Sequence, residues 1–412
     1  MTALSPSHVP ASAVRQFPAL LSLLGVLLAV AAFRWFNLHN SNLCLVLIVA
    51  AVAAPHVWPF GKTFGKISRT ESDGHAVRER IVVKCIGLLA VYGLIASAYF
   101  LFRGFYLSFV QPLGGFWFSL WLPVLCASPI YVYLADRVML QPEDGLYQFG
   151  KVVTGRYREA DWPVVKQYLL AWVVKGFFAP LMVGFALKDI EWILNYDFAK
   201  SLQTATNAYA FAYRFAYLID VAFAAAGYLC TFRLFDSQIR STEPTMAGWV
   251  VCLMCYPPFW TIFQDNFLKY EEDYYWGNWL ASHDVLWFCW AIMIVACLII
   301  YSWATVTFGM RFSNLTNRGI LTNGPYRWMK HPAYVAKNIS WWLISVPFIS
   351  NEGGEAALRN SVLLLLVNTV YFLRAKTEER HLMKDPSYVE YSAWMEQNSL
   401  YAKILRKPGL RI

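Results

Sequence analysis

Ten apolar runs divide this chain, and their repetition constrains its fold more than any other feature. An α-helix needs about 20 apolar residues to cross the hydrocarbon core of a bilayer. Only 15% of the residues are charged, against roughly 25% in soluble domains. We therefore expect an all-α, polytopic membrane protein with about ten transmembrane helices. The expected spans are about 17–35, 41–59, 84–102, 113–135, 167–187, 209–232, 248–267, 285–308, 335–350 and 358–374.

The basic residues between these runs are unevenly distributed. If residues before the first span are cytoplasmic, 25 Lys and Arg fall on the cytoplasmic side and 6 on the other. Lys and Arg concentrate in cytoplasmic loops of membrane proteins. This pattern predicts that the first span is retained and that both termini are cytoplasmic. It also accounts for the net charge of +9, so we expect no nucleic-acid partner.

The cysteines indicate little chemistry. Nearly all eight lie within apolar runs, and Cys252 and Cys255 form a CxxC without a second pair or a nearby His. Small thiols that pack in a core are the simpler interpretation, although a redox pair or structural metal site would use the same spacing. We expect no metal.

The polar stretch GILTNGPYRWMKHPAY, residues 319–334, lies between two long apolar runs. Its glycines permit backbone conformations closed to other residues, and its prolines fix φ and end helices. The loop would therefore present cations, an imidazole and aromatic rings just before a helix N-terminus, which attracts anions. Aromatic faces attract a cation such as a sulfonium. An ordinary positive-inside loop with interfacial Trp and Tyr has the same composition.

A second polar segment, residues 374–395, follows the last apolar run and is expected on the same side of the membrane. Arg374 and Glu378 are four residues apart on a helix, so they can pair. Glu378 and Glu379 point about 100° apart, so we expect only one to face a given site. A solvated helix end is the alternative interpretation.

Together these two segments resemble the isoprenylcysteine carboxyl methyltransferase and phospholipid methyltransferase superfamily, over roughly residues 290–405. The resemblance is carried by Gly324-Pro325-Tyr326, His331-Pro332-Ala333-Tyr334, Glu378-Glu379-Arg380-His381-Leu382, and the pair Tyr388 and Tyr391. The chain departs from the family pattern at Lys330, Ala336 and Asp385-Pro386. Lys keeps the charge of the usual Arg but lacks its planar fork.

The resemblance implies S-adenosylmethionine as cofactor, bound on the cytosolic side, and a lipid or lipid-linked acceptor that enters from the bilayer. It implies catalytic roles for Lys330, His331, Glu378 and Glu379. Substrate binding would fall to Arg374, Tyr388 and Tyr391. The expected cofactor-binding residues are Gly324, Pro325, Tyr326, Arg327, His331, Pro332, Tyr334, Glu378 and Glu379.

Several alternatives remain open at this stage. The acceptor could be a prenylcysteine carboxylate, a phospholipid or a lipid phosphate. A sterol-reductase-like enzyme using NADPH would carry a similar HPxY loop, but Ala333 and Leu382 fit the methyltransferase pattern better. A transporter or scaffold with a degenerate site is a third reading. The expected location is the cell membrane, multi-pass, or the endoplasmic reticulum membrane in a eukaryote. The sequence leaves the oligomeric state open.

Residues 1–285 form a separate N-terminal transmembrane region of unknown role, and residues 286–412 form the methyltransferase-like domain. Charges within spans are costly and often functional. In the N-terminal region, Arg214 and Asp220 are six residues apart, which places them poorly for pairing on one helix. We expect Asp220 to pair with Lys175 of the neighbouring span.

Overall fold

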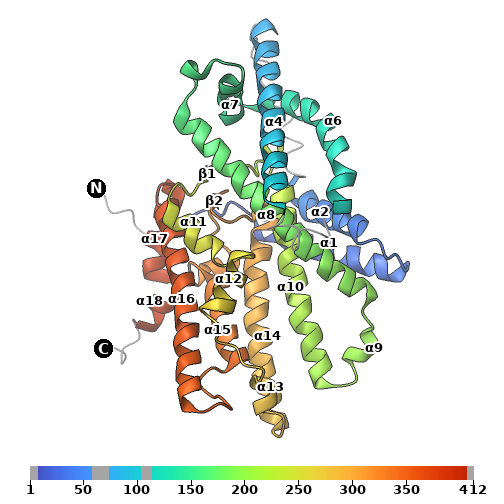
Figure 1. Ribbon diagram of the computed structural model, residues 1–412, viewed down its shortest axis with the longest axis vertical. Helices are drawn as coiled ribbons and strands as arrows, with labels where there is room; N and C mark the ends of the chain where they lie inside the picture. The colour runs from blue at the N-terminus through green and yellow to red at the C-terminus, as the bar shows by residue number, and fades with distance from the viewer. Residues whose placement is uncertain (1–7, 58–73, 104–113, 406–412) are drawn as a thin grey trace.

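The computed structural model describes residues 8–57, 74–103 and 114–405, and almost all of the regular structure in these ranges is helical (Figure 1). The long helices follow the apolar runs because a helix satisfies its own backbone hydrogen bonds. The elements are α1 Gln16–Trp35, α2 Ser41–Val57, α4 Gly74–Leu101, α6 Gly114–Val138, α7 Gly145–Val153, η3 Tyr157–Glu159, α8 Trp162–Asn195, α9 Phe198–Ser201, α10 Ala205–Leu229, η4 Arg233–Phe235, β1 Ser241–Thr242, α11 Met246–Leu253, α12 Phe259–Asn266, α13 Trp276–Trp279, α14 Asp284–Thr307, η5 Gly309–Arg311, β2 Thr316–Asn317, η6 Gly324–Arg327, α15 Pro332–Ser345, α16 Gly354–Leu382, α17 Pro386–Asn398 and α18 Leu400–Leu405.

Within the described residues, six helices are long and apolar enough to cross a membrane: α1, α4, α8, α10, α14 and α16. The all-α, membrane-type fold is therefore confirmed, whereas the count of ten spans is not. α2 is apolar but has 17 residues. The expected span 248–267 divides into α11 and α12, with Pro257 and Pro258 between them. The last two residues of the expected span 41–59, and the first of 113–135, lie outside the described residues.

The end of α15 also differs from the sequence prediction. The helix has 14 residues and stops at Val346, whose φ of 45° lies in the left-handed region. Pro347 follows directly and restricts the residue before it. α15 is therefore shorter than the ~20 residues that a full span requires.

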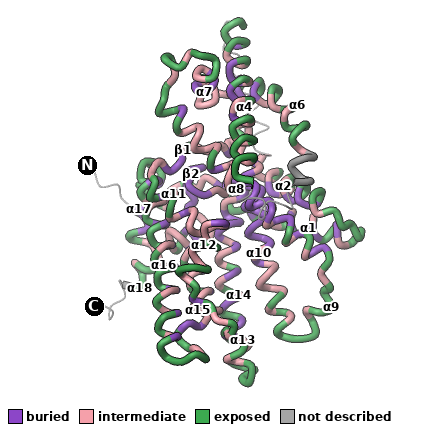
Figure 2. The backbone as a smooth tube through the Cα atoms, in the orientation of Figure 1, coloured by how far each residue is buried: buried purple, intermediate pink, exposed green. Residues whose placement is uncertain are grey.

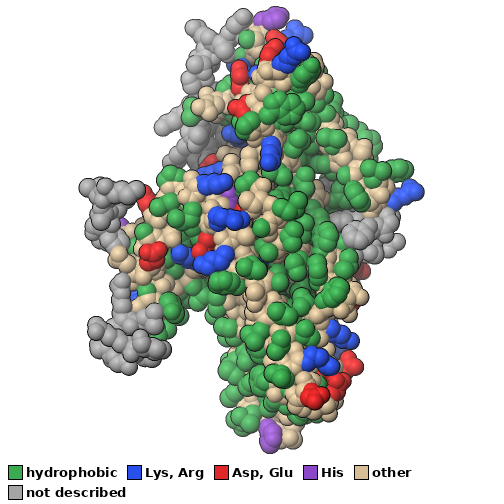
Figure 3. Space-filling model, turned by 60° about the vertical axis from the view of Figure 1, so that its left-hand side comes forward, with side chains coloured by type: hydrophobic (Ala, Val, Ile, Leu, Met, Phe, Trp, Pro, Cys, Tyr) green, Lys and Arg blue, Asp and Glu red, His purple; other side chains and the backbone are tan. Residues whose placement is uncertain are grey.

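The long helices do not all lie at one level. α10, α14 and α16 run through the half of the molecule that ends at α13, whereas α4, α6 and α7 lie toward the opposite end (Figure 1). The face in Figure 3 is largely hydrophobic, with charged side chains gathered near its two ends and across its middle. Such a broad apolar surface is expected where helices face lipid.

The core is centred on α8, α10 and α2, where buried residues gather (Figure 2). Close approach here depends on a glycine. A Cβ on Gly227 of α10 would lie 2.5 Å from the carbonyl oxygen of Phe312, just after η5. Glycine therefore lets the segment that carries the polar loop pack directly on α10.

The prediction that Asp220 forms an ion pair with Lys175 is wrong. Asp220 accepts hydrogen bonds from Tyr301, at 2.7 Å, and from Thr305, both on α14. The Lys175 ammonium lies over the Trp172 ring instead, 3.3 Å from its centroid. Sequence gives the helix on which a charge lies but not the helix that it faces, and α14 supplies two hydroxyl donors to Asp220.

A two-stranded antiparallel pair joins the two halves of the chain. β1 pairs with β2, with Ser241 opposite Asn317 and Thr242 opposite Thr316. The pair is short, but it brings residues 241–243 against the polar loop that follows α14. The site described next therefore draws on both sides of the boundary expected near residue 285.

Candidate functional site

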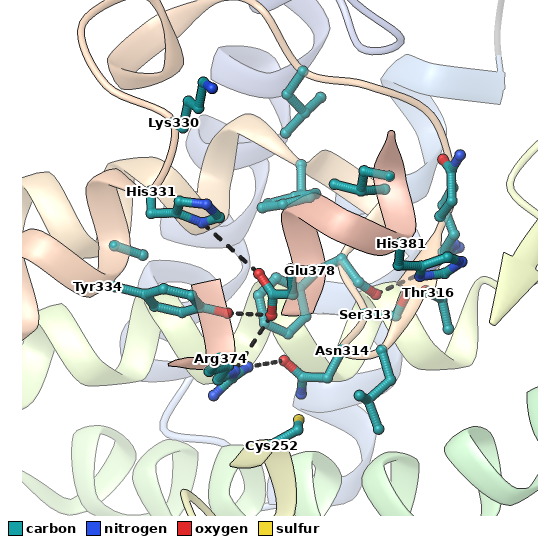
Figure 4. A pocket seen from close by; sticks show the side chains of 18 of the residues that line it. Cys252, Ser313, Asn314, Thr316, Lys330, His331, Tyr334, Arg374, Glu378 and His381 are labelled. Carbon is teal, nitrogen blue, oxygen red and sulfur yellow. Dashed lines mark hydrogen bonds and ion pairs between the residues drawn. The ribbon is translucent and has the colours of Figure 1, made fainter. Parts of the chain in front are cut away.

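His331 lies at the N-terminal cap of α15, and Pro332 occupies the first turn, where its missing N–H is not needed. The imidazole stacks on the Tyr334 ring, with centroids 5.4 Å apart and planes 5° from parallel. This arrangement turns the imidazole toward the end of α16 (Figure 4).

Glu378 and Glu379, near the end of α16, both reach His331. Its Nε2 lies 3.1 Å from Glu379 Oε1, and its Nδ1 lies 3.8 Å from Glu378 Oε2. Only Glu378 also lines the adjoining cavity, whereas Glu379 additionally contacts Lys376 at 3.2 Å. The sequence expectation that one carboxylate faces the site agrees with this lining, but both hold the imidazole.

Arg374 holds the Glu378 carboxylate in place. The predicted i,i+4 contact is present, with Arg374 Nε 3.3 Å from Glu378 Oε1, and Tyr334 donates a hydrogen bond to the same carboxylate oxygen. Arg374 also donates to Asn314 Oδ1 at 2.8 Å. Charge-assisted hydrogen bonds of this kind are the strong ones. Arg374 and Glu378 therefore form part of a fixed network rather than a solvated helix end (Figure 4).

These residues line a cavity of about 170 Å³ between the polar loop and α16. Three of its lining residues carry buried polar atoms without a hydrogen-bond partner in the described structure: Glu243 Oε2, Asn314 Nδ2 and Tyr388 Oη. An unpaired buried polar group costs about 1–3 kcal/mol. A ligand with both donors and acceptors would satisfy all three atoms.

The polar loop is held by a buried guanidinium. Arg318 donates to the carbonyls of Ser237, Gly227, Phe312 and Met310 at 2.7–2.8 Å. These contacts satisfy carbonyls that no regular secondary structure pairs. Gly324, with a φ of 55°, makes the turn into η6, as its position in the sequence predicted.

Segment 9–14, which precedes α1, packs along the same loop. Ala13 N–H donates to the Ile320 carbonyl at 2.8 Å, Thr322 Oγ1 donates to the Pro10 carbonyl at 2.7 Å, and Asn323 donates to the Val14 carbonyl at 2.7 Å. The loop is therefore clamped from outside by residues about 300 positions earlier in the chain.

α17 closes the other side of the loop. Tyr391 donates to the Tyr326 carbonyl at 2.7 Å, and Lys330 donates to Ser392 at 2.8 Å. Burial raises the pKa of Tyr388 and of Tyr391 above the usual tyrosine value, so both phenols stay neutral donors. Asp385 caps α17 and accepts from Asn317 of β2 at 2.7 Å, which gives the Asp385-Pro386 departure from the family pattern a structural role.

The expected site residues fall into three groups: those that line the cavity, those that lie behind its wall, and those that line a second cavity. Tyr326, Lys330, His331, Tyr334, Arg374, Glu378, Tyr388 and Tyr391 line the cavity. Pro325 and Pro332 are buried beside it, and Glu379 contacts it through His331. Gly324 and Arg327 line a second cavity, next to α17 and the segment before α1.

Sequence reasoning missed several residues of the cavity wall. Glu243 and Tyr256 come from the region before residue 285, and Asn314 from the turn before β2. His381, part of the quoted motif, lies against Ser241 at 2.9 Å. Lys337, which falls inside the expected span 335–350, also lines the cavity. Buried polar residues within or beside apolar runs were the available signal.

No metal centre is formed within residues 8–57, 74–103 and 114–405, where no cluster of three His, Cys, Asp or Glu side chains could hold an ion. Cys252 and Cys255 are free thiols, and Cys252 lines the cavity.

The fold and the site define a helical, membrane-type protein with a polar cavity at the end of two long helices. Residues 285–384, a quarter of the 412 residues, match the model of the Isoprenylcysteine carboxyl methyltransferase (ICMT) family. This match confirms, for that region, the resemblance found in the sequence. No curated protein and no solved structure matched the chain.

Proposed function

We propose that this protein is an integral-membrane methyltransferase that uses S-adenosylmethionine to methylate a lipid or lipid-modified acceptor. One observation carries the proposal: His331, Tyr334, Arg374 and Glu378 converge on one cavity of a protein whose long helices are apolar enough to cross a membrane. Such a position suits a water-soluble cofactor and a lipid-soluble acceptor. The segments 309–334 and 374–412 would then lie on the cytoplasmic side, with both termini.

The lining of the cavity fits the proposed cofactor. The unpartnered oxygen of Glu243 could accept from a hydroxyl or an ammonium, and the unpartnered amide nitrogen of Asn314 could donate to a carboxylate or a ring nitrogen. The rings of Tyr334 and Tyr371 also line the cavity. When bound, S-adenosylmethionine would supply a methyl group carried on a sulfonium.

The residues of the chain would act by positioning. Tyr334 and Arg374 fix Glu378 at the cavity wall, and Asn314 accepts a hydrogen bond from Arg374, so the carboxylate needs little reorganisation when a ligand binds. A carboxylate or phosphate acceptor is already ionised and needs no strong base, whereas an amine or hydroxyl would need a proton acceptor. His331, Glu378 and Glu379 are the candidates for that role.

Thermal stabilisation of the purified protein tests the proposal. S-adenosylhomocysteine at about 100 times its dissociation constant should add about 2.7 kcal/mol to the free energy of unfolding. NADPH at the same concentration should add nothing. Stabilisation by NADPH alone would replace the proposal with a reductase, and stabilisation by neither ligand would favour a scaffold or transporter.

A further inference from the structure

Lys337 of α15 is a cation in the wall of the cavity. It follows Tyr334 by three residues on α15, so the two side chains share a helix face and are about 4.5 Å apart along the axis. Both line the cavity. A group held at Lys337 would therefore lie about one helical turn from the network of Tyr334, Glu378 and Arg374.

Aromatic rings surround the Lys337 ammonium. Its Nζ lies 5.3 Å from the ring centroid of Trp341, 5.5 Å from that of Tyr301 and 5.8 Å from that of Tyr371. Contacts within about 6 Å stabilise a cation. Tyr301 and Tyr371 also line the cavity, so aromatic surface lies next to the ammonium, as in a site for the part of a lipid next to its head group.

The other cations of the cavity wall all have oxygen partners. Arg374 binds Glu378 and Asn314, and Lys330 binds Ser392. Arg311 binds Asp236 at 2.9 Å, and Arg318 binds four carbonyls. Lys337 makes no ion pair or side-chain hydrogen bond with any described residue. Its nearby carboxylate, Asp220, already accepts from Tyr301 and Thr305.

A buried lysine without a direct ion pair or hydrogen bond is costly in an apolar site. The three rings and the nearby carboxylate of Asp220 offset only part of that cost, so an anion that enters the cavity would supply the direct partner that Lys337 lacks. We propose that Lys337 binds the anionic head of the acceptor, and so selects acceptors that carry a carboxylate or phosphate on an apolar chain. This inference rests on the proposed function, since it names the acceptor site of the same cavity. It involves binding and no change of covalent bonds.

The test compares three probes that share one farnesyl chain. N-acetyl-S-farnesylcysteine carries a carboxylate, its carboxamide is neutral, and farnesyl phosphate carries a phosphate. Their apparent dissociation constants are measured from thermal stabilisation of the full chain in detergent, with S-adenosylhomocysteine present. The wild-type protein should bind at least one anionic probe about tenfold more tightly than the carboxamide. The probe that binds tighter distinguishes a carboxylate acceptor from a phosphate acceptor.

Substitutions then assign the preference to one residue. Lys337→Met should abolish the preference for the anion, and Lys337→Arg, which keeps the charge, should retain it. Lys175→Met is the matched control, because Lys175 also lies on an indole ring but does not line the cavity. It should leave the preference unchanged.

Two outcomes would overturn the inference. One is a wild-type protein that binds both anionic probes no better than the carboxamide, and the other is a Lys337→Met variant that keeps the preference. If Lys337→Met does not fold, loss of the preference in Lys337→Arg would also overturn it. S-adenosylhomocysteine is assayed separately without probes, and its failure to stabilise any variant would reject the methyltransferase proposal while leaving the anion measurement interpretable.

Discussion

The N–H of Ala13 donates to the carbonyl of Ile320 across 2.8 Å, and this bond joins the segment before α1 to the loop that precedes the candidate cofactor site. Nearby, Val14 packs with Leu321 and Tyr326 in one buried cluster. The conformation of the loop therefore depends on contacts with residues from the opposite end of the chain.

Removing one of these contacts should weaken ligand binding. Thr322 is 2% exposed and donates to the Pro10 carbonyl, so Thr322→Val keeps the shape but loses the bond. We expect the free energy of unfolding to fall by about 1 kcal/mol and S-adenosylhomocysteine to bind less tightly. Both are measured by thermal denaturation with and without the ligand. Thr369→Val, which removes only a bond within α16, should leave ligand affinity intact; equal affinities in both variants would contradict the coupling.

His331 should matter for the ligand more than for the fold. Because its imidazole bridges Glu378 and Glu379 and stacks on Tyr334, His331→Ala should free all three side chains at the cavity. We expect at least a tenfold loss of S-adenosylhomocysteine affinity, about 1.4 kcal/mol, measured by calorimetric titration. The control is His283→Ala, at the exposed start of α14. Unchanged affinity in His331→Ala would exclude His331 from the site.

Loss of the charge on Glu378 should destabilise the protein even without a ligand. Arg374 is 3% exposed, and Glu378→Gln would remove its carboxylate partner. Hydrogen bonds to charged groups contribute about 1.5–3 kcal/mol, so we expect a loss of that size in the free energy of unfolding. Glu352→Gln removes the exposed ion pair with Arg359 and should cost under about 1 kcal/mol. Similar losses in both variants would show that the buried network contributes no special stability.

Arg318 should be essential for the stability of the polar loop that follows α14. Arg318→Met would leave the carbonyls of Ser237, Phe312 and Met310 without a donor, each at a cost of about 1–3 kcal/mol. The Gly227 carbonyl would keep only its bond from Thr231. A loss above about 4 kcal/mol is expected, which is exceptional for one substitution. Thermal denaturation measures it, and limited proteolysis should show new cleavage between residues 309 and 334. Arg15→Met, on the exposed surface, should change neither; a stable, uncleaved Arg318→Met variant would refute the prediction.

Much of the candidate site follows from local sequence. The pairing of Arg374 with Glu378 was predicted from their spacing because i,i+4 neighbours meet on any helix. A turn at Gly324 was predicted because glycine adopts positive φ at little cost. The structure shows a φ of 55° there. The match of residues 285–384 to the family model confirms the family resemblance over that region.

Other predictions failed because they required knowledge of packing. Asp220 was paired with Lys175 from their expected neighbouring spans, but it faces hydroxyl groups of α14. The expected span 248–267 divides into two helices, and this division brings Tyr256 to hydrogen-bond Asn314 at 3.1 Å. Hydropathy is averaged over a window of residues. It therefore cannot show that a helix is interrupted, or that the interruption allows a contact with a residue far away in the chain.

The sequence by itself determined the helical, membrane-type fold, the polar loop and its His331, and the carboxylates that follow the last apolar run, because hydropathy and short spacings act within one segment. Only the tertiary structure decided that β1 pairs with β2, that segment 9–14 packs on the loop, and that Lys337 lines the cavity without a direct ion pair to a described residue. These features join residues tens to hundreds of positions apart. Their geometry depends on how whole helices pack against one another, which no local pattern specifies.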